Sequence, residues 1–486
     1  MNRPRGRQGK SIVSRASARY RLRMLTTFFR AKLFRTLLVC CLASVRMRAM
    51  AAAEASLQPV QRLDPTIQKI VADISEERIA AILRKLESFE TRNTLSDPSQ
   101  ATRGIGVARQ WIFDQFRSYS PRLEVSFDTH RIPKGGRVWK EVELRNVVAI
   151  LPGKMSVASN RWIMVSGHYD SLNLKDAAVL RGQPEKAAEL FAPGVSDDAS
   201  GTACAMECAR VLSQYEFDAT LVFVAFAGEE QGLIGARAFA KRLGGQKQEI
   251  EALLNNDIVG NEVSGNDDSD NRRVLLFSED PNDSPSRQIA RFVRSIAAKY
   301  CPEITVDMIF RHDRFGRGGD HTAFNEEGFP AVRFTTASEN FANQHSATDT
   351  FTNASVRYTA KVVRINAAAA AALALAPAPP INRSPAANGR SRAGLTRGSG
   401  YDAVLRWDHP KPEPDLAGFM VVVRATTAPD WEREFWAGNV REFTLKNTPI
   451  DQLVFGVKAV DRDGHESPVA AYVNQPRRTN SDAAVE

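Results

Sequence analysis

Apolar residues recur along the first three quarters of the chain in short runs that alternate with segments of helical period. Runs of β-branched and aromatic residues predict strands at 123–131, 142–151, 162–170, 220–226, 253–260, 274–277 and 330–335. Helical spacing predicts helices that begin near Ser75 and that cover 105–119, 202–212, 233–243, 284–300 and 355–376. Because strands and helices alternate, residues 62–376 are predicted to form an α/β domain with a mostly parallel central sheet flanked by helices.

The pattern changes after this domain. Residues 377–400 are rich in Pro, Gly, Ser and Arg and are predicted to be a linker. Short apolar runs at regular spacing then predict a small all-β sandwich over 401–476, with a tail at 477–486. The sandwich resembles a fibronectin type III module, in which Trp407 would be the core tryptophan and 457–468 the last hairpin.

The positive charge of the chain is concentrated at its N-terminus. The chain has 65 Lys and Arg and 56 Asp and Glu, and residues 1–50 hold 13 of the basic residues and no acidic one. Subtraction leaves 52 basic and 56 acidic residues for 51–486, a net charge of −4. A mildly acidic body lacks the basic surface that nucleic acids require, so we expect no nucleic-acid partner.

The basic leader has the pattern of an export signal. An apolar run from Thr36 to Val45 is followed by a small-x-small cleavage site at Ala49, Met50 and Ala51. Residues 1–51 are therefore predicted to contain a signal peptide, and the protein is expected to be exported to a periplasmic or extracellular location. The run is too short for a membrane span, so no stable membrane insertion is expected. The alternative interpretation is a disordered basic tail.

Two adjacent carboxylates stand at the centre of the chemical interpretation. Glu229 and Glu230 follow the buried strand predicted at 220–226. Charge at the edge of an apolar core is costly unless a partner or a metal compensates it. The rest of the chain must therefore supply that compensation.

Further His and acidic residues follow other predicted strands or lie in loops of the same domain. They are His168 with Asp170, the Asp197–Asp198 pair, Asp257 and His345. Singly, each has a simpler explanation: His168 could be only hydrogen-bonded, and the Asp pair could be a helix N-cap, which explains one Asp but not the second. Because strand ends in such sheets meet at one edge, His168, Glu229, Glu230 and Asp257 are expected to converge.

Imidazole and carboxylate ligands without thiolates suit zinc, manganese or cobalt in a reactive site better than a structural zinc. The inventory allows two metal sites joined by one bridging carboxylate.

The order of the motifs is distinctive. They run His-x-Asp, Asp-Asp-Ala-Ser-Gly, Glu-Glu-x-Gly-Leu-x-Gly, Asn-x-Asp and His-Ser-x-x-Asp-Thr. Together they closely resemble the secreted co-catalytic dizinc aminopeptidases, which include bacterial leucyl aminopeptidase, aminopeptidase S and aminopeptidase Y. The resemblance spans about 65–375.

The resemblance implies two zinc ions and a role for each matched residue. Asp197 would bridge the ions, His168 and Asp257 would complete one site, and Glu230 and His345 the other. Glu229 would be the general base for a water between the two ions, and Asp170 would orient His168. Asp198 would follow a cis peptide bond. The implied activity is an exopeptidase that releases N-terminal residues from peptides or proteins.

Three alternatives remain at this point. Carboxypeptidases and glutaminyl cyclases share much of the pattern, and Arg311, Arg314 and Arg317 could recognise a substrate carboxylate, although a solvated basic loop is the simpler explanation. A protein of another class, a degenerate peptidase used for adhesion, would have lost ligands that this chain keeps. The sandwich could contact a surface or a polysaccharide, or be a stabilising appendage.

Overall fold

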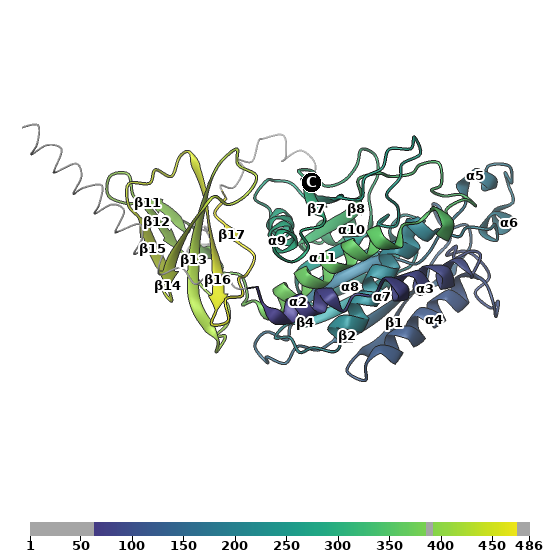
Figure 1. Cartoon of the computed structure of the whole chain (residues 1–486), viewed down its shortest axis with the longest axis horizontal. Coiled ribbons are helices and arrows are strands. Elements are labelled where there is room, and N and C mark those ends of the chain that lie inside the picture. Colours follow the sequence, from purple (N-terminus) through teal and green to yellow (C-terminus); the bar gives the residue numbers. More distant parts are fainter. Residues whose placement is uncertain (1–62, 385–391, 474–486) are drawn as a thin grey trace, which may run out of the picture. The chain divides into compact units, whose positions relative to one another are not determined.

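The computed structural model describes residues 63–384 and 392–473, so the predicted leader and tail lie outside the described residues. The α/β domain forms around an eight-stranded sheet of order β1-β2-β4-β3-β5-β8-β6-β7 (Figure 1). The strands are β1 Glu124–Ile132, β2 Val142–Leu151, β3 Arg161–His168, β4 Thr220–Phe226, β5 Glu249–Asn256, β6 Arg273–Ser278, β7 Thr305–Ile309 and β8 Ala331–Thr336. The pairings of β3 with β4, β3 with β5, β5 with β8 and β6 with β7 are parallel, and the other pairings are antiparallel. The predicted α/β class with a mostly parallel sheet is confirmed.

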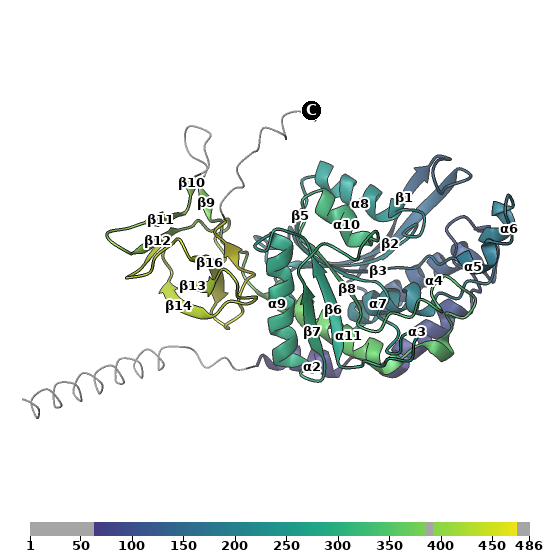
Figure 2. The same cartoon turned by 90° about the horizontal axis from the view of Figure 1, so that it is seen from above.

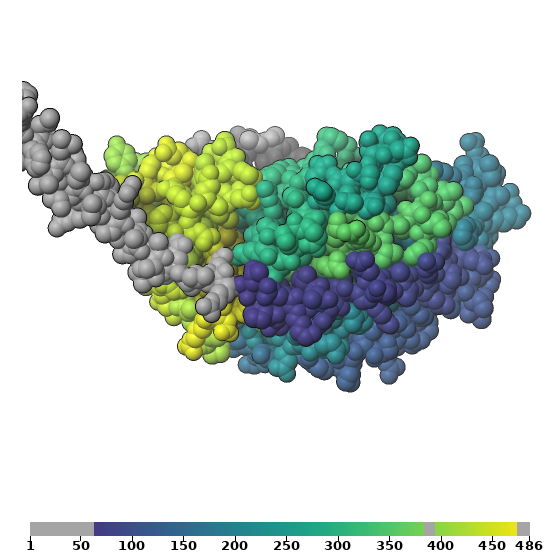
Figure 3. Space-filling model, in the orientation of Figure 1, coloured from purple at the N-terminus to yellow at the C-terminus, as the bar shows by residue number. Residues whose placement is uncertain are grey.

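Helices cover both faces of this sheet (Figure 2). One face packs against α8 Ile234–Gly245 and α10 Asp320–Glu326. The other face packs against α2 Pro65–Ala72, α3 Glu76–Glu87, α4 Gly104–Tyr119, α7 Ser200–Leu212, α9 Pro285–Tyr300 and α11 Val356–Leu375. Figure 3 shows α2 and α3 at the surface beside α11. Two short helices, α5 Leu174–Ala177 and α6 Pro184–Ala188, lie in the segment after β3.

Local sequence explains why these elements form where they do. Ser75 caps α3 by accepting the N–H of Arg78, and the apolar positions of that helix are buried as their spacing predicts. All seven residues of β4 are buried, because alternate side chains enter the two cores on opposite faces of the sheet. The Ala-rich α11 is buried along most of its length, since its small side chains allow close packing against α7 and α9.

Two glycines bring the start of α7 against the sheet. A Cβ on Gly167 would lie 2.2 Å from the carbonyl carbon of Gly201, and a Cβ on Gly201 would lie 2.2 Å from the main-chain oxygen of Asn256. Real Cβ atoms do not approach backbone atoms this closely, so both positions require glycine. The close approach places the loop before α7 directly over the ends of β3 and β5.

The C-terminal part forms two small sheets around a second core. One sheet is β11 Leu395–Arg397, β12 Ala403–Arg406 and β15 Glu442–Leu445; the other is β14 Arg433–Gly438, β13 Leu416–Ala425, β16 Leu453–Asp461 and β17 Ala470–Ala471. A two-residue pair, β9 Arg383–Ser384 and β10 Arg392–Ala393, precedes them. Trp407 is buried in this core against Phe419, with ring centroids 5.5 Å apart. The core position predicted for Trp407 is confirmed.

The structure differs from the sequence prediction at the edges of the sandwich. β11 pairs with β12 although it lies within the predicted linker 377–400, because strand pairing rather than apolar content defines it. The predicted hairpin at 457–468 is present, with Val460 bridged to Glu466, and its return segment continues beyond 468 into β17.

Side-chain contacts join the sandwich to the α/β domain. Lys411 binds Glu249 at 2.7 Å, Arg424 binds Asp283 at 2.6 Å, and His465 binds Asp64 at 2.8 Å. None of the helices in the described part of the chain is long and apolar enough to cross a membrane.

Candidate metal centre

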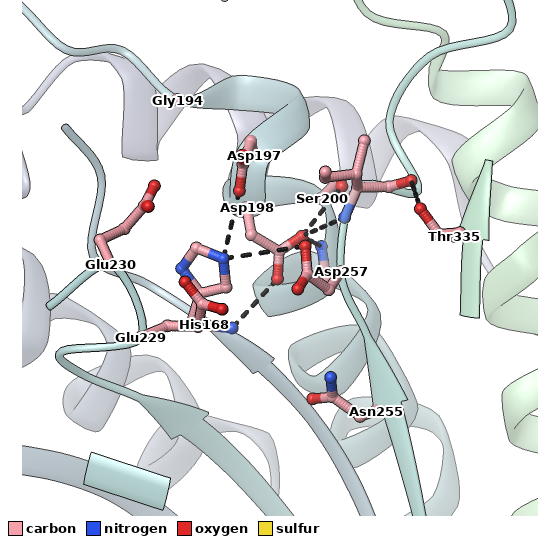
Figure 4. Close-up of polar contacts among 12 residues, drawn as sticks. His168, Gly194, Asp197, Asp198, Ser200, Glu229, Glu230, Asn255, Asp257 and Thr335 are labelled. Atoms are coloured by element: carbon pink, nitrogen blue, oxygen red, sulfur yellow. Dashed lines mark hydrogen bonds and ion pairs between the residues drawn. The ribbon is translucent and has the colours of Figure 1, made fainter. Parts of the chain in front are cut away.

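The predicted convergence of strand ends is confirmed. His168 is the last residue of β3, Glu229 and Glu230 follow β4, and Asp257 follows β5. These three strands are neighbours in the order β4-β3-β5 and run parallel to one another, so their carboxyl ends meet at one edge of the sheet. Asp197 reaches the same edge from the turn η1 (Val195–Ala199), which precedes α7 (Figure 4).

The first group of candidate ligands consists of His168, Asp197 and Asp257. One donor atom from each lies within 4.8 Å of the others. Nε2 of His168 is 3.2 Å from Oδ1 of Asp197 and 3.9 Å from Oδ1 of Asp257. All three side chains are buried, and Nε2 of His168 has no hydrogen-bond partner among the described residues.

The second group shares Asp197 and adds Glu230 and His345. Nε2 of His345 is 3.1 Å from Oδ2 of Asp197 and 3.2 Å from Oε2 of Glu230. Asp197 therefore offers one carboxylate oxygen to each group, which is the geometry of a bridging ligand. His345 is the most exposed of these side chains, so the centre opens to solvent on its side.

The chemistry of the donor atoms fits a metal. Burial raises the pKa of both Glu230 and Asp257 above the usual carboxyl range, so their charged forms are costly without a cation. The buried Nε2 of His168 and Oε1 of Glu230 lack hydrogen-bond partners within the described chain, although buried polar atoms normally have one. Each group offers three nitrogen or oxygen atoms that lie within 4.8 Å of one another. Zinc commonly binds such sets of His and carboxylate ligands.

Asp170 supports the centre more broadly than predicted. Nδ1 of His168 lies 3.1 Å from the main-chain oxygen of Asp170 and 3.4 Å from its carboxylate. The Asp170 carboxylate also accepts the backbone N–H groups of Glu229 and Glu230, at 3.2 and 3.3 Å. Asp170 thus orients His168 through its main chain and fixes the Glu229–Glu230 turn through its side chain.

The two aspartates of the predicted pair have separate positions. The peptide bond between Asp197 and Asp198 is cis, which confirms that prediction. Asp198 belongs to neither ligand group, and its carboxylate accepts the N–H groups of His168, Gly201 and Ile258, at 3.0, 2.9 and 3.1 Å (Figure 4). The helix-cap interpretation therefore describes Asp198, which bonds the first turn of α7, whereas Asp197 belongs to the metal groups.

Glu229 lies beside the first group without contributing to either (Figure 4). Its side chain is half-buried, and burial together with the neighbouring carboxylates raises its pKa well above the usual range. A carboxylate whose pKa is raised accepts a proton more readily than an ordinary carboxylate does.

A charged cluster behind Asp257 was not predicted. The fully buried Arg333 lies 3.0 Å from Asp257 and 3.0 Å from Asp313. His321 is also buried there, with its Nε2 3.4 Å from Asp313. The signal available in the sequence was an arginine inside the apolar strand at 330–335, since such a charge must have a buried partner.

The arginines considered for a substrate carboxylate are mostly engaged. Arg314 binds Asp313 and, at 2.9 Å, Glu339, and Arg317 also binds Glu339. Arg311 stacks over the exposed ring of Phe315, with its guanidinium carbon 4.2 Å from the ring centroid. Arg314 and Arg317 are therefore held by acidic side chains of the protein itself, and Arg311 is held by an aromatic ring.

Comparison with known proteins agrees with this geometry. The model of peptidase family M28 matches residues 146–370, a range that contains all seven predicted site residues. A probable zinc metalloprotease of the fungus Pyrenophora tritici-repentis is 32% identical over 447 residues, which cover 83% of this chain and 96% of the relative. The chain belongs to peptidase family M28. It is accordingly a zinc metalloprotease, and the expected hydrolase and metallopeptidase class is confirmed.

Solved structures show the same fold as this M28 peptidase. Glutaminyl cyclase of Macrostomum lignano is 17% identical with a TM-score of 0.50, over 64% of this chain and 94% of that one. At this identity the likeness shows the fold alone. The LapA aminopeptidase of Legionella pneumophila, 21% identical over 65% of this chain and 78% of that one, has a TM-score of 0.49.

Proposed function

We propose that this M28 metalloprotease is an aminopeptidase that binds two zinc ions and releases N-terminal residues from peptides or proteins. The observation that carries the proposal is the pair of ligand groups joined by Asp197, with Glu229 beside them. His168, Asp197 and Asp257 would hold one ion, and Asp197, Glu230 and His345 the other. When bound, the ions would supply an activated water as nucleophile and polarise the scissile carbonyl group.

The residues of the chain then perform the proton transfers. Glu229 accepts the proton that the attacking water loses and delivers it to the leaving amine when the peptide bond breaks. The products are a free amino acid and a peptide shorter by one residue. Asp170 holds the backbone of Glu229 in place, so the carboxylate need not reorganise during the reaction.

The arginines near the centre are not free to recognise a substrate carboxylate. Arg314 and Arg317 are both bound to Glu339. A carboxypeptidase would need a free cation at this place to hold the C-terminal carboxylate of its substrate. This supports an aminopeptidase over a carboxypeptidase. All matched ligand positions are present and grouped, which supports an enzyme over an adhesion protein.

The test compares blocked and free substrates with the full chain. Zinc-loaded protein is incubated with an aminoacyl amide, with its N-acetylated form and with a peptide that begins with Gln. We expect hydrolysis of the free amide only, its loss with a chelator and its recovery with added zinc. Cleavage of the acetylated amide, or release of ammonia from the Gln peptide without hydrolysis, would overturn the aminopeptidase proposal. Activity that resists chelation would overturn the metal assignment.

We further infer that the protein is exported and that the sandwich provides a contact with a surface or a polysaccharide. The basic leader with its apolar run and cleavage site supports export. Amino-terminal sequencing of the protein secreted by its host tests this point: a mature protein that still begins at Met1 would contradict it. Retention of the full chain, but not of residues 1–376, on an insoluble polysaccharide would support the role of the sandwich, and equal retention would oppose it.

A further inference from the structure

The turn that carries Asp197 is held by two charged side chains that belong to neither ligand group. Arg92 binds the main-chain oxygens that precede the turn, and Asp349 binds the main-chain N–H groups within it. Both side chains are buried, and both come from segments distant in sequence from η1. Arg92 thus binds carbonyl oxygens just before the turn, and Asp349 binds N–H groups within it. Together the two side chains hold the backbone on both sides of Asp197.

Arg92 ties the Asp197 turn to the segment that carries His168. Its Nε donates to the main-chain oxygen of Tyr169 at 2.7 Å. Its two terminal nitrogens donate to the oxygens of Pro193 and Gly194 at 2.6 and 2.8 Å, and Nη1 also reaches Leu86 at 3.1 Å. One guanidinium group thus joins the residue after His168 to the residues just before the turn.

Asp349 ties the same turn to the segment that carries His345. Its Oδ1 accepts the N–H of Ser196 and its Oδ2 accepts the N–H of Asp197, each at 2.9 Å. Its main-chain oxygen accepts the N–H of Val195, also at 2.9 Å. Because Asp349 lies four residues after His345, these three bonds fix the distance between the His345 loop and the bridging carboxylate.

We propose that Arg92 and Asp349 are positioning residues that together set Asp197 between His168 and His345. The proposal rests on the proposed function only for the identity of the ligands. Arg92 sets the geometry on the His168 side, and Asp349 sets it on the His345 side. Neither residue touches substrate, so each acts through the ligand that it positions.

The chemistry of the two side chains predicts that even conservative replacements will loosen the Asp197 turn. Lysine keeps the charge of Arg92 but offers a single nitrogen, which cannot reach carbonyl oxygens from three different segments at once. Asparagine in place of Asp349 keeps one accepting oxygen but turns an N–H group toward one of the two backbone donors. Both changes therefore loosen the Asp197 turn while leaving the volume of the site almost unchanged.

A third variant serves as the matched control. Arg287 is also fully buried and donates to the main-chain oxygens of Ser278 and Glu279, at 3.0 and 3.4 Å, outside the ligand groups. Replacing it with lysine removes the same kind of interaction at another place. Any loss that comes from general destabilisation will appear in Arg287→Lys as well.

The experiment measures zinc affinity in the full chain by competition with a colorimetric chelator, together with the melting temperature of each metal-free variant. We expect Arg92→Lys and Asp349→Asn each to weaken zinc binding by about 10–100-fold, as loss of a partner behind a ligand typically does. We expect Arg287→Lys to lower the melting temperature. Its zinc affinity should stay within about twofold of the wild type, because Arg287 does not contact the ligands or the turn that carries Asp197.

Wild-type zinc affinity in both Arg92→Lys and Asp349→Asn would overturn the proposal. So would an equal loss in Arg287→Lys. If Arg92→Lys does not fold, Asp349→Asn against the same control decides the question. The readout does not depend on the substrate: a wild-type chain that binds zinc but leaves peptides intact would refute the proposed function and still test this inference.

Discussion

The contact between His465 and Asp64 makes the stability of the protein depend on pH. Nδ1 of His465 lies 2.7 Å from Asp461, Nε2 lies 2.8 Å from Asp64, and only 14% of the side chain is exposed. Burial alone would lower the pKa of His465, but the hydrogen bonds and charges of the two carboxylates outweigh it and raise the pKa from 6.5 to about 9. The folded protein therefore binds this proton more tightly than the unfolded chain does.

The sign and size of the effect follow from this difference. Stabilisation by protonated His465 is fully present below the unfolded pKa of 6.5 and is lost as the pH rises through about 9. At about 1.36 kcal/mol per pKa unit, a difference of about 2.5 units corresponds to about 3 kcal/mol. Partial exposure of the site makes about 2 kcal/mol the expected loss of unfolding free energy between about pH 6 and about pH 9.5.

Urea unfolding of the wild type and of His465→Gln at the two pH values measures this contribution. Glutamine keeps hydrogen-bonding groups but does not titrate, so we expect it to destabilise the protein at about pH 6 and to have little effect at about pH 9.5. Asp64→Asn, which removes one of the two carboxylates, should show a smaller effect of the same sign. If wild type and His465→Gln differ equally at both pH values, the reasoning is wrong.

Three further outcomes follow from the structure. Glu229→Gln should keep its zinc, measured by metal analysis, while kcat falls by about 10²–10⁴-fold, the usual contribution of a general base; an active variant would refute that role. Gly201→Ala should yield little folded protein and reduced zinc content, because its Cβ would lie 2.2 Å from a backbone oxygen. Arg161→Met should lower the unfolding free energy by about 3–5 kcal/mol, since it leaves Glu251 buried without its partner; a wild-type denaturation midpoint would contradict this.

Much of the fold and the convergence of the site could be predicted because they rest on local pattern. The β-branched runs mark buried strands, and a His, Asp or Glu stands at the end of each of the strands β3, β4 and β5 or within a few residues after it, at the same edge of the sheet. Parallel strands bring such ends together whatever the details of packing. The positions of His168, Glu230 and Asp257 could therefore be predicted from the sequence. The strands β14, none of whose residues is fully buried, and β11, which has only three residues, were not predicted.

The supporting residues could not be predicted, because their partners lie far away along the chain. Apart from Leu86, the main-chain oxygens that Arg92 binds lie 77 to 102 positions away, and any loop in the fold could have supplied them. Main-chain oxygens carry no residue signature, so a sequence pattern cannot reveal which ones a buried arginine binds. Arg333 could be noticed in the sequence, because it is a charged residue within an apolar strand. Its pairing with Asp257 and Asp313 depends on the folded structure and could not be predicted.

The balance of charge in the centre supports two ions rather than one. Asp170 and Asp198 are each compensated by several hydrogen bonds from the protein, and Arg333 is balanced by Asp313. Asp197, Glu230 and Asp257 supply three carboxylates to the two candidate ligand groups, and Glu229 and the buried Asp320 lie near them. A single divalent ion would leave excess negative charge in this buried region, which a second divalent ion reduces. Since uncompensated buried charge is costly, this excess of carboxylates supports the proposed pair of ions.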